Sequence, residues 1–283
     1  MNSLSLVVAE AAEAIWKEMK KKVLEKSDRP ETGFPLFDKA TLNMLPGDVT
    51  VIHSSHQTAK LHFILNVLQR VAKVKRGIKK DNVRPTIVQN GLPSYYFGMR
   101  ESAMETLIQL ACIEGNIPRA EFEDIIRQGK SQQLEDAKEA LKQSTLTIHG
   151  RSCGYSCYDL LGSLAKDKIK LIVIDSFESL LSGSVAPLHT LNEIKSHAFR
   201  LESHIIVCVD LVDDGGTRSP QAIMKNAWIE AGADNVFAIP RNDFDLATNT
   251  LTLQVVKSRQ NIFTEEEVYP YQPGSGLIGT ESV

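Results

Sequence analysis

The chain has 283 residues, of which 42% are hydrophobic and 24% are charged, with a formal net charge of −3 and a pI near 6.2. This length can bury a sizeable core, and the composition is that of an ordinary soluble globular protein. The weak negative charge excludes a global basic field, so any DNA contact needs local patches or several subunits. Because no apolar run approaches about 18 residues and no signal-peptide pattern opens the sequence, we expect an intracellular, cytoplasmic protein without membrane contact.

Residues 4–26 have the pattern of an amphipathic helix. Apolar side chains recur every three to four residues from Leu4 to Val23, and charged side chains occupy most of the other positions. The pattern ends before Pro30, because proline disfavours helix in the residue that precedes it. The apolar stripe packs either on its own domain or on a neighbouring subunit. We therefore divide the chain into a linker or oligomerisation helix over 1–30 and a main domain over 31–283.

Residues 49–65 have the layout of a phosphate-binding loop that lacks its usual residues. An apolar run leads into a polar turn, one lysine and a helical pattern, as in the motif G-x-x-x-x-G-K-[ST]. Lys60 matches the lysine of this motif, but Ser54 and Ala59 stand at the two glycine positions. Glycine lets backbone N–H groups wrap the phosphates, and Ala59 adds a Cβ that strains this cradle. Leu61 stands at the Ser/Thr position, where a leucine cannot bind Mg²⁺.

The remainder of the chain alternates between short apolar runs and helical patterns. Alternation of this kind predicts an α/β fold with a mostly parallel central sheet and helices on both faces. A more strictly alternating run at 251–256 is typical of an edge strand. Buried strands are predicted at 49–52, 170–174, 205–209 and 236–239, and helices near 61–74, 100–114, 118–128, 133–142, 157–166 and 189–202.

Two minor patterns favour structural interpretations. Cys153 and Cys157 are four residues apart, but no second pair accompanies them, so we expect no metal site. The charged run at 73–84 is typical of a solvated surface connection, with a nucleic-acid or partner contact as the alternative.

The order of several motifs resembles the C-terminal RecA-like motor domain of DnaB-type replicative helicases, with more distant similarity to RadA and KaiC relatives. The motifs are TGFPLFDKATLNMLPGDVTVI (32–52), the altered loop, ACIEGNI (111–117), LIVIDS (171–176), IEAGADNVF (229–237) and KSRQN (257–261). The resemblance spans about residues 8–265 and is most specific at 32–48 and at the pair Lys257 and Arg259. It implies a RecA-like P-loop NTPase fold and a linker helix that docks on the next subunit of a hexameric ring. We therefore expect a homo-oligomer, either a ring or a dimer, formed through residues 4–26, with DNA or replication proteins as partners.

The resemblance assigns four basic or acidic residues to a nucleotide site. Lys60 matches the lysine that contacts the β/γ-phosphates, and Asp175 matches the Walker-B acid that holds the metal's water shell. Lys257 and Arg259 match a basic finger that reaches the neighbouring subunit's nucleotide, a task suited to the planar donor fork of arginine. The structural alternatives are a turn-capping acid for Asp175 and an exposed basic strand end for the pair.

The general base of this family has no clear counterpart. The family's catalytic glutamate follows the strand after the P-loop helix, and two placements of that strand remain open. If it lies at 86–93, Leu92 takes the glutamate position, and if it lies at 95–99, Gly98 does. Neither residue can accept a proton from water. Glu101 lies nearby and is interpreted as an acid in the first turn of a helix, where the dipole favours it.

Two further departures weaken the motor interpretation. Asp210 takes the position of a polar sensor and would repel a γ-phosphate. The DNA-facing loops correspond to 182–189 and 212–224, and the charges near the second, including Arg218 and Lys225, nearly cancel. A motor that follows a phosphate backbone normally presents more positive charge there.

Three hypotheses follow from these residues. The first is a DnaB-like RecA-fold protein without efficient ATP hydrolysis, acting as an assembly or accessory subunit in DNA replication. The second is an active helicase or translocase with an atypical loop, and the third is a protein-binding scaffold without nucleic acid. ATP binding without efficient hydrolysis is compatible with the first, whereas Leu61 argues against Mg²⁺. If the pocket is inactive, we expect Lys60→Ala to have little effect on stability in nucleotide-free buffer.

Overall fold

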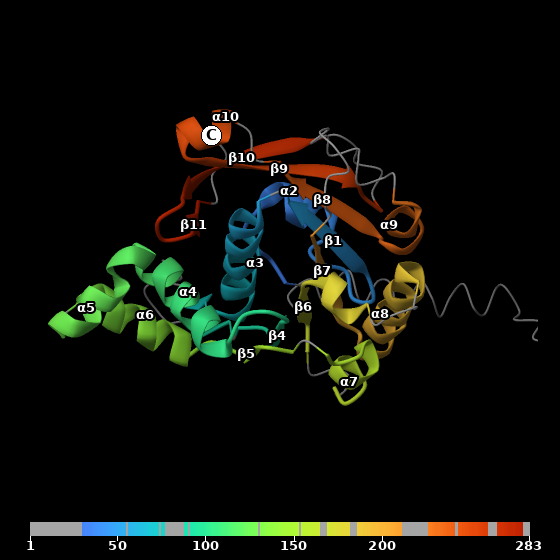
Figure 1. The fold of residues 1–283 in the computed structure, drawn as a ribbon, viewed down its shortest axis with the longest axis horizontal. Coiled ribbons are helices and arrows are strands. Elements are labelled where there is room, and N and C mark those ends of the chain that lie inside the picture. The colour runs from blue at the N-terminus through green and yellow to red at the C-terminus, as the bar shows by residue number, and fades with distance from the viewer. Residues whose placement is uncertain are drawn as a thin grey trace, which may run out of the picture.

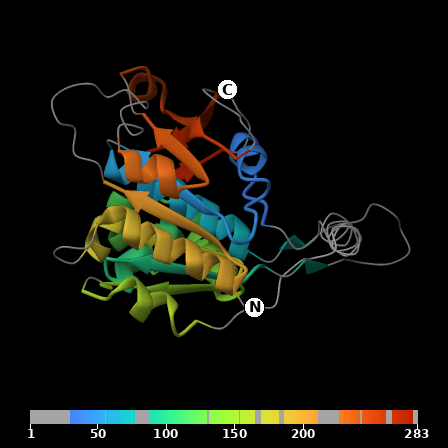
Figure 2. The ribbon, with the colours of Figure 1, turned by 90° about the vertical axis from the view of Figure 1, so that its right-hand side faces the viewer.

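The computed structural model describes residues 30–54, 56–73, 75–76, 88–89, 91–129, 131–152, 154–164, 169–181, 186–210, 226–240, 243–259 and 265–279. These residues form a nine-stranded sheet with helices on both faces (Figure 1), and a two-stranded ribbon stands apart from it (Figure 2). The predicted α/β class with a mostly parallel central sheet is therefore confirmed. The helix predicted at 4–26 lies outside the described residues.

The main sheet has the strand order β11-β10-β9-β8-β1-β7-β6-β4-β5. The six strands from β8 to β5 run parallel, and β9, β10 and β11 are each antiparallel to their neighbours. The strands are β1 (Val49–Ser54), β4 (Ser94–Gly98), β5 (Leu146–His149), β6 (Leu171–Asp175), β7 (His204–Val209), β8 (Asn235–Ile239), β9 (Thr250–Lys257), β10 (Glu266–Gln272) and β11 (Leu277–Ile278), with β2 (Lys75–Arg76) and β3 (Val88–Gln89) in the ribbon.

Helices cover both faces of the parallel strands. Side chains alternate along β6: Leu171 and Val173 join the core cluster that contains α3, whereas Ile172 and Ile174 join the cluster that contains α7, α8 and α9. Both faces of the central strands β1, β6, β7 and β8 are buried, which explains why their sequences are largely apolar runs. The helices are α2 (Pro35–Ala40), α3 (Gln57–Ala72), α4 (Ala103–Gly115), η2 (Arg119–Glu121), α5 (Phe122–Gln128), α6 (Gln132–Lys142), α7 (Cys157–Leu161), η3 (Phe177–Leu180), α8 (Pro187–Leu201), α9 (Ala227–Gly232) and α10 (Asp243–Thr248).

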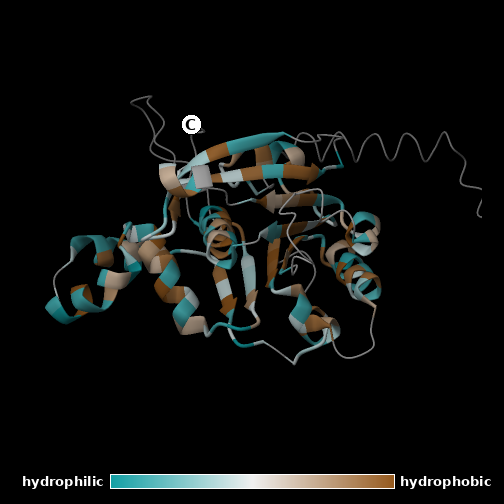
Figure 3. Cartoon of the chain, turned by 45° about the horizontal axis from the view of Figure 1, so that its top comes forward, coloured by the Kyte–Doolittle hydropathy of each residue, from teal (hydrophilic) through white to brown (hydrophobic). Residues whose placement is uncertain are grey.

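Apolar residues are concentrated on the central strands, and the outlying helices α5 and α6 are largely polar (Figure 3). These two helices pack with α4 around a smaller apolar cluster that includes Cys112, Ile117 and Phe122. They extend the domain at one side of the sheet (Figure 1).

The segment before β1 is fixed by an internal network. The carboxylate of Asp38 accepts hydrogen bonds from the backbone N–H of Thr32, from its hydroxyl and from the N–H of Gly33. The rings of Phe34 and Phe37 both contact Phe63 on α3, with centroids 4.9 and 5.7 Å apart. The motif segment 32–48 therefore attaches the entry of the domain to α3.

One predicted edge strand lies inside the sheet. The run at 251–256 belongs to β9, which pairs with β8 on one side and β10 on the other, so the edge prediction is wrong. Strand β10 is hidden in the sequence because it begins within a run of glutamates and contains Pro270, which lacks a backbone donor. The helix predicted at 157–166 is also shorter than expected, because α7 ends at Leu161.

The open placement of the strand after α3 is resolved. Strand β4 follows α3 in the main sheet and ends at Gly98, which pairs in register with Asp175. Gly98, not Leu92, therefore stands at the strand end. Glu101 precedes the N-cap of α4, because Ser102 Oγ accepts the hydrogen bond from the Glu105 N–H. The interpretation of Glu101 as a first-turn acid is wrong, and Glu105 occupies that position.

Candidate functional site

A small pocket lies where the carboxyl ends of β4, β6 and β7 meet the first turn of α3. Ligands of open α/β sheets bind at this edge of the sheet. The cavity has a volume of about 150 Å³, which is below the range of roughly 300–1,000 Å³ typical of small-molecule sites. Its lining residues are Gln57, Thr58, Lys60, Leu61, Tyr96, Gly98, Arg100, Glu101, Asp175, Ser176 and Asp210.

The first turn of α3 stands at the position of the phosphate-binding loop. The helix begins at Gln57, three residues before Lys60, and His56 is its N-cap. The His56 ring Nδ1 accepts the N–H of Ala59 at 3.3 Å, and the His56 carbonyl accepts the N–H of Lys60 at 3.2 Å. The N–H of His56 itself donates to Ser54 Oγ at 3.0 Å. Backbone donors that a phosphate-binding loop would direct at phosphates are thus bound within the chain.

Lys60 is held by carboxylates of its own chain. Its side chain is 2% exposed, and its Nζ donates to Asp210 and lies 3.8 Å from Asp175 Oδ1. Burial acts to lower the pKa of Lys60, but the neighbouring Cys208, Asp175 and Asp210 outweigh it and raise the pKa. Arg100 Nη1 binds the second oxygen of Asp210 at 3.0 Å. Asp210 therefore occupies two cations that would otherwise meet a phosphate.

Asp175 lies at the end of β6 and faces Lys60, as the sequence predicts. Burial raises the pKa of Asp175, an effect that Lys60 opposes and Asp210 reinforces. The hydroxyl of Tyr96 on β4 points to Asp175 Oδ2 at 3.4 Å. The pocket thus keeps a lysine in the first turn of α3 and an acid at the end of β6, although a third group, Asp210, binds the lysine.

The apolar positions of the loop belong to the core. Ala59 is fully buried and Leu61 is 9% exposed, and both pack in the cluster around α3. Leu61 also borders the pocket, where it supplies no oxygen ligand. These two residues support the packing of the helix rather than phosphate binding.

Three acceptor residues at the pocket were missed as site residues by sequence reasoning. Glu101 and Ser176 line the cavity, and Glu178 Oε1 accepts the N–H of Asp210 at 2.7 Å. Burial raises the pKa of Glu101, with the charges of Asp175 and Glu105 adding to the effect. The one available signal was position, because Glu101 and Ser176 each follow the end of a predicted parallel strand.

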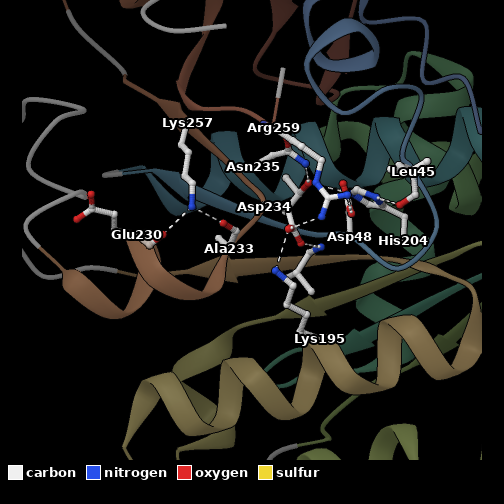
Figure 4. Close-up of polar contacts among 12 residues, drawn as sticks. Leu45, Asp48, Lys195, His204, Glu230, Ala233, Asp234, Asn235, Lys257 and Arg259 are labelled. Atoms are coloured by element: carbon white, nitrogen blue, oxygen red, sulfur yellow. Dashed lines mark hydrogen bonds and ion pairs between the residues drawn. The ribbon is translucent and has the colours of Figure 1, made fainter. Parts of the chain in front are cut away.

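Lys257 binds the end of a neighbouring helix. Its Nζ donates to the carbonyls of Glu230 and Ala233, each at 2.6 Å, at the C-terminal end of α9 (Figure 4). Lysine at this position satisfies carbonyls that have no partner within the helix.

Arg259 binds two buried acids near the start of the central strands (Figure 4). Its guanidinium lies 3.1 Å from Asp48 and 3.0 Å from Asp234, and Lys195 also binds Asp234 at 2.8 Å. Arg259 and Lys257 lie near each other but away from the Lys60 pocket. Their contacts are at the amino ends of β1 and β8, whereas the pocket lies at the carboxyl ends of the parallel strands. The assignment of both residues to a finger acting on a neighbouring subunit stays a prediction.

Two residues beside Arg259 and Asp234, namely Asp48 and His204, have strongly shifted pKa values. Burial and the charge of Asp234 raise the pKa of Asp48 to about 6, although Arg259 and Lys195 oppose the shift. Burial lowers the pKa of His204 to about 4. Its two ring nitrogens lie 3.0 Å from the Leu45 carbonyl and 2.9 Å from Thr50 Oγ1, so both are satisfied by the neutral ring.

Several sequence predictions fall on residues that the structure leaves undescribed. Arg218, Lys225 and Cys153 lie outside the described residues. Cys157 is buried among apolar side chains, and burial raises its pKa to about 12. Within the described ranges, no group of three or more His, Cys, Asp or Glu side chains is arranged to hold a metal ion. The helices in those ranges also include none with the length and apolar character of a membrane span.

Comparison with known proteins shows the fold. The sequence matches no family model and no curated protein. Among solved structures, the chain is similar to one described as an ATPase domain, with a TM-score of 0.76 and 14% identity over 98% of this chain and 99% of that one. It is similar to a DnaB-like replicative helicase, described with its interactions with primase, with a TM-score of 0.74 and 14% identity over 98% of this chain and 67% of that one. The chain therefore has the RecA-like fold of helicase ATPase domains.

Proposed function

We propose that this protein is a RecA-fold accessory or assembly subunit related to DNA replication that does not hydrolyse ATP efficiently. Its functional context comes from the fold, which it shares with a DnaB-like replicative helicase and with a solved ATPase domain. Its partners are further copies of itself, through residues 4–26, and replication proteins or DNA. Arg218 and Lys225 are the basic residues that we assign to a weak DNA contact.

One observation carries the proposal: the groups that would bind phosphate are bound by the chain itself. Lys60 and Arg100 bind Asp210, and the N–H groups of Ala59 and Lys60 bind His56. An incoming triphosphate would have to break these contacts and approach Asp210 and Asp175, whose charges repel it. Leu61 offers no ligand for the Mg²⁺ that normally offsets this repulsion. ATP, if it binds, is therefore expected to bind weakly and without Mg²⁺.

A second candidate, an ATP-dependent helicase or translocase, is favoured by the placement of Glu101. This carboxylate lines the pocket three residues after the end of β4, close to where a general base would act on water. In that interpretation Asp210 would release Lys60 when a nucleotide enters. The two candidates make opposite predictions for nucleotide binding.

Calorimetric titration of ATP into the full chain, with and without Mg²⁺, separates the candidates. We expect no saturable heat at sub-millimolar ATP, and no phosphate release in a parallel assay. Asp210→Asn is the informative variant, because it removes the charge that holds Lys60 and repels phosphate, and it is expected to bind ATP more tightly than the wild type. Binding by the wild type that Mg²⁺ strengthens would refute the proposal and support the motor.

A further inference from the structure

The pocket contains buried acceptors that lack a donor. Ser176 is 2% exposed, and among the described residues its Oγ has no hydrogen-bond partner. The same holds for Glu101 Oε2, and both residues line the cavity. Glu178 Oε2 is a third buried oxygen without a partner in the described part of the chain. The other carboxylate oxygen of Glu178, Oε1, accepts the Asp210 N–H. Unsatisfied buried polar atoms are rare in native proteins, because each costs roughly 1–3 kcal/mol.

The pocket is surrounded by more negative than positive side chains. Four carboxylates, those of Glu101, Asp175, Glu178 and Asp210, face two cations, Lys60 and Arg100. Both cations already bind Asp210, so the other three carboxylates share what remains of their charge. Burial is the main cause that raises the pKa of Glu101, Asp175 and Glu178, and the charge of a neighbouring carboxylate adds to the shift of each.

We propose that this pocket binds a small organic cation with N–H donors, a guanidinium or primary ammonium group, in the place where a related fold holds phosphates. Such a group supplies both the positive charge and the donors that Ser176 and Glu101 lack. The cavity of about 150 Å³ accepts a head group of this size. The inference goes beyond the proposed function and shares with it only the exclusion of phosphate.

A metal ion fits these residues less well. The described residues contain no cluster of three or more potential ligands in a metal-binding arrangement. Lys60 also lies 3.8 Å from Asp175, and its ammonium would repel a divalent ion about twice as strongly as a monovalent organic cation at the same distance. A guanidinium or ammonium group has several N–H donors that point in different directions, so it can reach separated oxygens that a single metal ion cannot bridge.

Titration calorimetry on the full chain tests the proposal with methylguanidinium chloride as the probe. Tetramethylammonium chloride at equal ionic strength is the matched control, because it has the same charge but no N–H donor. We expect saturable binding of methylguanidinium only. Glu101→Gln should weaken it by about tenfold or more, since it removes the charge from a hydrogen bond that the cation makes. Glu139→Gln is the matched control, at an exposed acid of α6 that pairs with Lys142 and does not line the pocket, and it should change the affinity less than about twofold.

Ser176→Ala provides a second variant that removes a buried oxygen without altering charge, and it is expected to weaken binding as well. Thermal unfolding checks that each variant is folded. Equal binding of tetramethylammonium, no weakening in either pocket variant, or tighter binding of Mg²⁺ that displaces the probe would overturn the inference. If neither methylguanidinium nor ATP binds, this inference is refuted and the proposed function is not. If ATP binds and is hydrolysed, the proposed function is refuted.

Discussion

Lys60 shows how a residue retained from a motif can take a different part in the structure. Its ammonium group is buried between Asp210 and Asp175, so its first contribution is to neutralise two carboxylates. The sequence alone predicts little effect of Lys60→Ala on stability in nucleotide-free buffer. The contacts of Lys60 reverse that expectation.

We expect Lys60→Ala to lower the free energy of unfolding by about 3 kcal/mol, because removing one partner of a buried ion pair strands the other charge. Urea denaturation followed by circular dichroism measures the change. Lys73→Ala is the matched control: this lysine lies just beyond the same helix, is 47% exposed and pairs with Glu114, and its loss should cost no more than about 1 kcal/mol. Equal unfolding curves for the two variants would contradict the assigned role of Lys60.

Asp48 and His204 predict an unusual dependence of stability on pH. Asp48 has a folded pKa of about 6, above its usual 3.8, so its contribution is present below pH 3.8 and is lost as the pH rises through 6. His204 has a folded pKa of about 4, below its usual 6.5, so its contribution is present above pH 6.5 and is lost as the pH falls through 4. Between these values the two effects oppose each other.

Asp48→Asn should remove the Asp48 effect and leave that of His204, which is common to both proteins and cancels in their difference. We expect the free energy of unfolding of this variant, relative to the wild type, to rise by on the order of 3 kcal/mol as the pH increases from 4 to 7. Urea titrations at several pH values measure the difference. Glu265→Gln, at a surface acid that pairs with Lys39, is the control and should show no such trend. A pH-independent difference for Asp48→Asn would disprove the shift.

At the scale of elements, Arg259 joins the end of β9 to the starts of β1 and β8. It binds Asp48, which precedes β1, and Asp234, which precedes β8, and Lys257 on the same strand binds the end of α9. The sequence singled out Lys257 and Arg259 as a distinctive pair. The resemblance assigns them a contact with the neighbouring subunit. Within one chain, however, they bind Asp48, Asp234 and the end of α9, and these contacts hold the end of β9 in place.

Arg259→Ala should destabilise the isolated chain by about 2 kcal/mol, because it removes the ion pairs of Arg259 with Asp48 and Asp234 and leaves the pair between Lys195 and Asp234. Adding Asp48→Asn should recover part of this loss, since it removes one of the stranded charges. A double-mutant cycle by chemical denaturation measures the coupling, which is expected to exceed about 1 kcal/mol for residues in direct contact. If Arg259 acted only on a neighbouring subunit, the single variant would unfold like the wild type.

For the whole molecule, the sequence predicted what depends on local burial and missed what depends on long-range pairing. The central strands β1, β6, β7 and β8 are buried on both faces, so their apolar runs are visible in the sequence, whereas β5 is only partly buried and has no such run. The pairing of Lys60 with Asp210 was not, because residues 150 positions apart meet only when strand ends share one edge of the sheet. The altered loop was recognised from its residue types, but the helical turn capped by His56 required the backbone. Strand β10 was missed because its glutamates hide the alternation of buried residues.

Oligomerisation is the property of the whole molecule that the described residues leave to experiment. The apolar spacing of residues 4–26 predicts a helix with one apolar face, and the proposed accessory role needs that face to dock on a neighbouring subunit. Deleting residues 1–26 should therefore lower the mass measured by light scattering. Ile15→Glu places a charge in the apolar stripe without shortening the chain and should have the same effect, because burying an unpaired charge is costly. Lys17→Glu, on the polar face, is the control and should keep the full mass; an unchanged mass for Ile15→Glu and for the deletion would show that this helix does not join subunits.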